Sequence, residues 1–130
     1  MVLSGESAGG IGAWINVDWL QDTLPHAKVL GAPIAGFYAF AHPYTGVGHT
    51  TGMMLSNFSE GAFPGHIKLW QSFLPQNCVK GLGSELSHRC MLSNYSAPFV
   101  KAPMFVTEAS SQNTSLLSCI VLFTTADLTA

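Results

Sequence analysis

One short segment near the N-terminus has the residue types and spacing of a nucleophilic turn, because Gly5-Glu6-Ser7-Ala8-Gly9 fits G-x-S-x-G. In a nucleophile elbow the serine lies on a strained turn between a strand and a helix, with its hydroxyl exposed. The backbone N–H of the next residue, Ala8, then points at the position of a tetrahedral oxyanion, and the helix N-terminus adds partial positive charge there. The pattern predicts a serine nucleophile. The alternative is a glycine-rich turn in which Ser7 caps the helix.

The elements around this turn are those that an elbow requires. An apolar stretch, residues 2–4, precedes it as a short strand, and apolar residues recur at helical spacing from Ile11 until Pro25 ends the helix. Strands separated by helical patterns predict an α/β fold with a parallel sheet. The later segments are predicted as a strand at 28–31, a loop at 32–52, a helix at 66–73, a polar loop at 76–98, a strand at 103–108, a polar turn at 109–115, and a strand or helix start at 120–123.

Cysteine and histidine patterns indicate structural roles. The cysteines form no C-x-x-C pair, so zinc is not expected. Cys78 and Cys90 lack a basic or helix-start setting that would activate a thiol, and they close a short polar loop that can hold a disulfide in an oxidising compartment. Cys119 would then be an odd thiol. The histidines show no metal-ligand spacing and are expected in loops or at the surface: His26, His42, His49, His66 and His88.

The composition excludes two classes of protein. Charged residues make up 9% of the 130 residues and apolar residues 48%, which is the opposite of a disordered segment. Five Lys and Arg against seven Asp and Glu give no basic face, so a nucleic-acid partner is not expected. So few charges predict an exposed apolar patch unless something covers it, and the chain is interpreted as a piece of a larger protein.

Targeting signals are mixed. No run reaches the roughly 18 apolar residues of a membrane span, and the N-terminus lacks the charged region and cleavage site of a signal peptide. Three Asn-x-Ser sequons nevertheless begin at Asn57, Asn94 and Asn113. Each is a glycan acceptor if the chain enters the secretory route. Such tripeptides also arise by chance in a serine-rich chain, so both interpretations stay open.

Residues 2–10, Val-Leu-Ser-Gly-Glu-Ser-Ala-Gly-Gly, resemble the nucleophile segment of the pectin acetylesterase family, which includes the palmitoleoyl-protein carboxylesterase Notum. The resemblance continues in family order over residues 1 to roughly 117. The further blocks are Asn16-Val17-Asp18, Ala35-Gly36-Phe37-Tyr38, Leu69-Trp70 with Leu74-Pro75-Gln76-Asn77-Cys78, and Val100-Lys101-Ala102-Pro103-Met104-Phe105-Val106.

The resemblance implies a partial α/β-hydrolase-like fold with a mostly parallel sheet, incomplete at both ends. Residues 1–117 would be part of the hydrolase domain, starting at the elbow, and 118–130 a divergent tail. Ser7 would be the nucleophile, Ala8 N–H an oxyanion donor, and Cys78–Cys90 a family disulfide. The family further implies a secreted hydrolase that needs no cofactor or metal and acts on an O-acylated polysaccharide or a lipidated protein.

The chain departs from the family at positions that matter for catalysis. Gln112 stands where the family places its catalytic aspartate, and an amide cannot stabilise a histidinium. No histidine follows His88, the glycine-rich oxyanion loop is absent, and Ile34 replaces an aspartate. We therefore expect an ester hydrolase that is inactive as this truncated chain. The alternative is a non-catalytic homologue that binds a glycan or an acylated protein.

Overall fold

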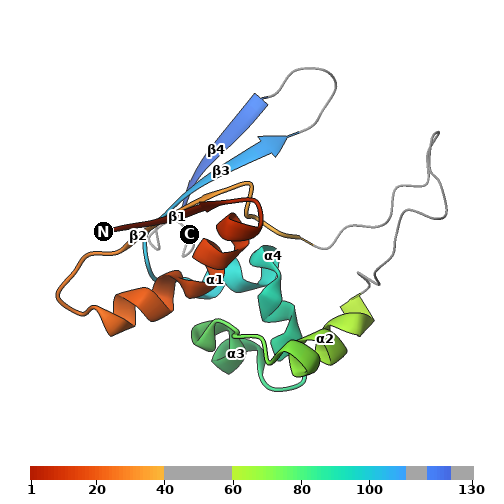
Figure 1. Cartoon of the computed structure of the whole chain (residues 1–130). Coiled ribbons are helices and arrows are strands. Elements are labelled where there is room, and N and C mark those ends of the chain that lie inside the picture. The colour runs from red at the N-terminus through yellow and green to blue at the C-terminus, as the bar shows by residue number, and fades with distance from the viewer. Residues whose placement is uncertain (40–59, 111–116, 124–130) are drawn as a thin grey trace, which may run out of the picture.

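The computed structural model describes residues 1–39, 60–110 and 117–123, with side chains up to Glu108, and contains one four-stranded sheet (Figure 1). The strands lie in chain order: β1 (Val2–Glu6), β2 (Leu30–Ile34), β3 (Met104–Ser110) and β4 (Leu117–Phe123). The first three strands are parallel and β4 is antiparallel to β3. Parallel strands connected through helical segments are an α/β arrangement, which confirms the predicted class.

Helix α1 (Ala8–Thr23) follows β1 after a single residue, Ser7. The predicted helix is confirmed, and it begins three residues before Ile11, the first residue of its apolar pattern. It ends where Leu24 leaves helical geometry, immediately before Pro25. A connection this short places the start of α1 directly at the carboxyl end of β1.

Strand β2 lies further along the chain than predicted. The strand prediction covered residues 28–31, because Pro33 suggested a loop. The N–H groups of Gly31 and Ala35 bond the carbonyls of Pro103 and Thr107 at 2.9 and 2.7 Å, and Pro33 occupies the alternate position between them. The ladder to β3 therefore tolerates one missing donor, because both flanking donors are bonded.

The middle of the chain is more helical than predicted. Helix α2 (Phe63–Trp70) replaces the helix predicted at 66–73, because Pro64 suits a first turn and Gln71 adopts a left-handed conformation that ends the helix. The polar loop predicted at 76–98 is wrong: this stretch holds α3 (Gln76–Leu82), α4 (Ser93–Ser96) and 3₁₀ turns at Ser87–Met91 and Ala97–Phe99. We call residues 76–99 the helical cap. Another 3₁₀ turn, Glu60–Ala62, precedes α2.

The two segments predicted near the C-terminus, at 103–108 and 120–123, are both strands, and they pair with each other as β3 and β4. The strand predicted at 103–108 runs from Met104 to Ser110, two residues into the predicted polar turn. Residues 120–123, left open between strand and helix, belong to β4.

The core forms between α1 and one face of the sheet, and Figure 1 shows the labelled helices gathered on that side. The buried cluster is Trp14, Val17, Val29, Val100, Ala102, Met104 and Val106. The alternate residues Val2, Leu30, Ile34 and Phe105 point to the other face and are 38–61% exposed. This face is the exposed apolar surface that the low charge content predicts. Of the helices that the structure describes, none is long and apolar enough to cross a membrane.

Candidate active site

Ser7 is the one residue between β1 and α1, and its backbone is strained. Its φ of 54° and ψ of −118° are those of the first central position of a type II′ turn, which glycine dominates. Such a conformation costs a non-glycine residue about 1–3 kcal/mol and clusters at functional sites. Ser7 is exposed and makes no side-chain hydrogen bond to the helix it precedes. The capping alternative therefore has no support in this geometry.

Two backbone hydrogen bonds fix this turn on both sides. The N–H of Ser7 donates to the carbonyl of Ile34 at the end of β2, at 2.9 Å. The carbonyl of Ser7 accepts the N–H of Ile11 at 3.0 Å, which closes the first turn of α1. Because the backbone is tied to a neighbouring strand and to the helix, the hydroxyl is presented from a fixed point at the carboxyl edge of the sheet.

Glycines let three backbone segments approach closely here. A Cβ on Gly5 would overlap the carbonyl of Gly9, and a Cβ on Gly10 would lie 2.6 Å from the Ile34 oxygen and 2.9 Å from the Gly36 Cα. The first turn of α1 therefore packs directly on β1 and on the exit of β2. We call residues 5–10 the elbow.

The start of α1 supplies the electrostatics that an oxyanion requires. Ala8 is the first residue of a 16-residue helix, where N–H groups lack intrahelical acceptors and the helix dipole is positive. The first turn carries no acidic side chain that would neutralise this end. An anion that forms beside the Ser7 hydroxyl would meet free donors and a favourable field.

The exit of β2 forms a second wall beside the elbow. Ala35 adopts a φ of 49°, which turns the chain out of the sheet. Ser93 then holds the next residues: its hydroxyl accepts the N–H of Tyr38 at 3.0 Å and donates to the carbonyl of Gly36 at 3.3 Å. The Glu108 carboxylate accepts the N–H of Phe37. Neither Ser93 nor Glu108 was identified from the sequence, because the contacts join residues 55 and 71 positions apart.

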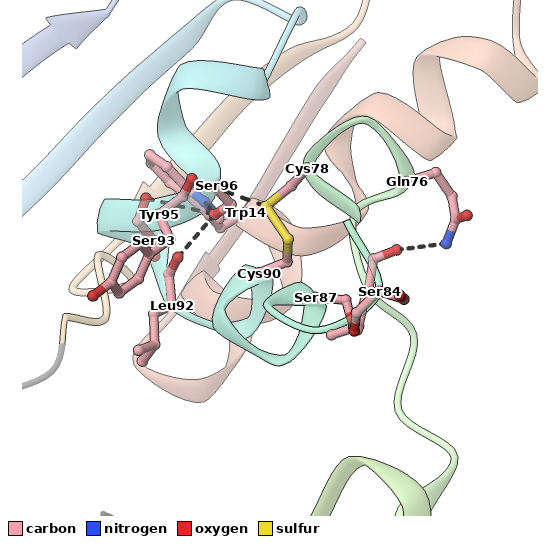
Figure 2. Close-up of a disulfide and its surroundings, with 11 residues drawn as sticks. Trp14, Gln76, Cys78, Ser84, Ser87, Cys90, Leu92, Ser93, Tyr95 and Ser96 are labelled. Atoms are coloured by element: carbon pink, nitrogen blue, oxygen red, sulfur yellow. Dashed lines mark hydrogen bonds between the residues drawn. A yellow bond between two sulfur atoms is a disulfide. The ribbon is translucent and has the colours of Figure 1, made fainter. Parts of the chain in front are cut away.

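The helical cap is joined to α1 through side chains (Figure 2). A disulfide links Cys78 in α3 to Cys90 in the following 3₁₀ turn. The indole N–H of Trp14 donates to the buried hydroxyl of Ser96 at 2.8 Å, and Ser96 in turn donates to the carbonyl of Leu92. This chain of contacts positions the cap against the helix that starts at Ser7.

Asp18, in the second half of α1, ties this helix to the helical cap and to the residues just before β3. Its carboxylate accepts the backbone N–H groups of Lys101 and Ala102, at 2.9–3.1 Å, and the side-chain amide of Asn77 at 2.9 Å. The sequence placed Asp18 in a family block without giving it a role. A carboxylate near the end of an apolar helix face was the available signal, but its partners lie 59–84 residues away.

Of the other candidate residues from the sequence, the structure describes some and leaves the others outside its described part. Asn94 is exposed on α4, where a sequon asparagine is accessible. Gln112, Asn113, Asn57, His42 and His49 lie outside the described residues, and only the backbone of Cys119 is described, in β4.

Two of the histidines contact neighbouring side chains. His66 stacks on Trp70 at a distance of 5.2 Å between the ring centres, and His88 lies 3.8 Å from the Glu60 carboxylate. Among the side chains that the structure describes, those of residues 1–39 and 60–108, no group of His, Cys, Asp and Glu could hold a metal ion.

Comparison with known proteins identifies the family to which the sequence of the chain is similar. The sequence model of a family described as Pectinacetylesterase matches residues 1–127. The chain is 34% identical over 111 residues to Palmitoleoyl-protein carboxylesterase NOTUM of Drosophila melanogaster, a match that covers 82% of this chain and 15% of the fly protein. It is 26% identical over 113 residues to Palmitoleoyl-protein carboxylesterase notum1 of Xenopus laevis, which covers 83% of this chain and 23% of the frog protein. The chain thus spans less than a quarter of the length of either relative.

Proposed function

The chain belongs to the pectinacetylesterase family, and on this basis we propose that it holds the nucleophile segment of a carboxylic-ester hydrolase with an α/β-hydrolase-like fold. Ser7 is the proposed nucleophile and the N–H of Ala8 one proposed oxyanion donor. The observation that carries this proposal is the strained, exposed serine between β1 and α1. A serine in a conformation that favours glycine is expected where its position serves chemistry rather than stability.

The proposed reaction proceeds through an acyl-enzyme. The Ser7 oxygen attacks the acyl carbonyl carbon, and its proton passes to a histidine base that this chain does not supply. The alcohol takes that proton and leaves, and water then releases the carboxylic acid and regenerates Ser7. The negative charge of each tetrahedral intermediate lies at the N-terminus of α1, where the field is favourable.

The proposed substrate class is an O-acylated polysaccharide or a lipidated protein. The family description names pectin and the two relatives are palmitoleoyl-protein carboxylesterases. We further propose a secreted protein. The disulfide between Cys78 and Cys90 and the exposed sequon at Asn94 support that compartment. The division into a domain at 1–117 and a tail at 118–130 stays a prediction.

The 130-residue chain by itself is expected to hydrolyse esters poorly or not at all. The family resemblance puts Gln112 at the acid position, and these 130 residues hold no histidine after His88, so we expect two members of a triad to be missing from them. Turnover of p-nitrophenyl acetate should therefore equal that of the Ser7→Ala variant. Turnover that the wild-type chain shows and Ser7→Ala loses would contradict this expectation and would identify Ser7 as the nucleophile.

The nucleophile proposal is tested in the longest open reading frame that contains this chain. We would sequence the transcript through both ends and express its product. An aspartate near position 112 and a downstream histidine should accompany ester hydrolysis that Ser7→Ala lowers by at least about 10⁴-fold. Ser4→Ala is the matched control, since Ser4 is an exposed serine on β1, three residues before Ser7. An active product that tolerates Ser7→Ala would overturn the assignment.

A second candidate is a homologue that binds its acylated ligand without cleaving it. The glutamine at position 112 favours it, because a protein that no longer hydrolyses esters has no need of the acid. In that case the longest product binds an O-acetylated pectin fragment or a palmitoleoylated peptide, measured by calorimetry, and leaves the ester intact. Hydrolysis of either ligand would exclude it.

A further inference from the structure

Glu108 lies near the end of β3, at the same edge of the sheet as the elbow. The carboxyl ends of β1, β2 and β3 share this edge because the three strands are parallel. Glu108 follows Met104 and Val106 by even steps, so its side chain points to the face that α1 covers. The carboxylate accepts the N–H of Phe37, which lies beyond the end of β2.

This contact completes a series of hydrogen bonds that runs from the elbow to β3. Ser7 N–H donates to Ile34, and Ala35 N–H donates to Thr107. The left-handed conformation of Ala35 then turns the chain out of the sheet, so that backbone pairing cannot continue. The N–H groups of Gly31 and Ala35 donate to backbone carbonyls of the β3 segment, and the next donor two residues on is the N–H of Phe37. Its acceptor is the Glu108 carboxylate instead of a backbone carbonyl.

The segment that Glu108 holds is the one on which the elbow packs. Gly36, adjacent to Phe37, is in close backbone contact with Gly10 in the first turn of α1. The Phe37 ring packs edge-on against Trp14 on the same helix, with ring centres 5.4 Å apart. A displacement of residues 36–37 would therefore move the first turn of α1, and with it the oxyanion donors beside Ser7.

We propose that Glu108 is a positioning residue for Ser7: as a hydrogen-bond acceptor it fixes the 36–37 backbone, and that backbone fixes the elbow. The proposal rests on the proposed function for its catalytic consequence, but not for its structural one. It differs from a role as the triad acid, since it requires an acceptor oxygen at the right distance and no negative charge.

Two substitutions separate these roles. Glu108→Gln removes the charge and keeps an oxygen at the same reach, whereas Glu108→Asp keeps the charge and withdraws the oxygen by one methylene. We expect amide hydrogen exchange, followed by NMR on the ¹⁵N-labelled chain, to be about tenfold faster at Phe37 and several-fold faster at Ser7 in Glu108→Asp. In Glu108→Gln both amides should stay within about threefold of wild type. Glu85→Ala, at an exposed carboxylate, is the matched control and should change neither amide.

The outcomes decide the proposal whether or not Ser7 is a nucleophile. An unchanged exchange rate at Ser7 in Glu108→Asp would overturn the positioning role. An equal rise of the exchange rates in Glu108→Asp and Glu108→Gln would overturn it as well. In an active longer product, Glu108→Asp should lower kcat by about 10- to 100-fold with little change in KM. Glu108→Gln should keep kcat close to the wild-type value. The reverse order, with Gln inactive and Asp active, would identify an acid and contradict positioning. Absence of Ser7-dependent hydrolysis would reject the proposed function alone, because the exchange rates are measured without turnover.

Discussion

The elbow and the helical cap are held together in opposite ways. In the elbow, backbone packs on backbone: Gly5 and Gly10, with Gly36 in the facing segment, remove the side chains that would keep the segments apart. In the cap, side chains make the decisive contacts, through the Cys78–Cys90 disulfide and the Trp14–Ser96 hydrogen bond. The elbow therefore depends on residues with almost no side chain, and the cap depends on a few specific ones.

This difference predicts different sensitivities to substitution. A region built on backbone contact has no room for an added methyl group, because carbonyl groups cannot move aside as flexible side chains can. A region built on side-chain contacts tolerates changes at most positions and fails at those few that make the contacts. Pairs of variants within each region test this contrast.

The largest effect is expected from Gly10→Ala in the elbow. The added Cβ would lie 2.6 Å from the Ile34 carbonyl oxygen, so α1 and β2 must separate. The loss should exceed about 4 kcal/mol in the free energy of unfolding, measured by urea denaturation.

Gly12→Ala is the matched control for that substitution. A Cβ at Gly12 meets nothing within 4 Å, and alanine favours a helix interior over glycine by about 1 kcal/mol. The two glycines lie two residues apart on one helix, so the same chemical change should have opposite signs. Equal effects would refute the close backbone approach at Gly10.

The next largest effect is expected from removing the disulfide of the cap. Cys78→Ala with Cys90→Ala opens a loop whose ends are separated by 12 positions. A loop of this length predicts a loss of about 3 kcal/mol, read from the urea midpoint. Reductant should destabilise the wild-type chain to a similar extent and leave the double variant unchanged. A double variant as stable as wild type would show that the packing of the cap suffices.

The smallest effect is expected at Ser7 itself and is stabilising. Glycine adopts a φ of 54° without strain, so Ser7→Gly should raise the free energy of unfolding by about 1 kcal/mol. Ser4→Gly, in the regular geometry of β1, should instead lower it by about 0.5–1 kcal/mol. A destabilised Ser7→Gly variant would mean that the turn stores no strain.

The sequence predictions were accurate around the elbow and inaccurate in the helical cap. The elbow was predictable because its signals are local: an apolar strand, a G-x-S-x-G turn and an apolar helical period lie within 24 residues. The polar stretch at 76–98 was predicted as a loop because few apolar residues mark its helical turns. Its turns are stabilised by a disulfide and by buried Ser93 and Ser96, and hydrophobic periodicity detects neither.

The sequence by itself determined the α/β class, the strand–turn–helix around Ser7 and the family resemblance, since each is built from short local patterns taken in their order along the chain. Only the tertiary structure decided that Glu108 reaches Phe37, that Asp18 reaches Lys101 and Ala102, and that Ser96 reaches Trp14. These partners are 71–84 positions apart. A polar side chain carries no mark of which distant donor it will meet, because folding brings the two together only when the sheet and α1 have formed.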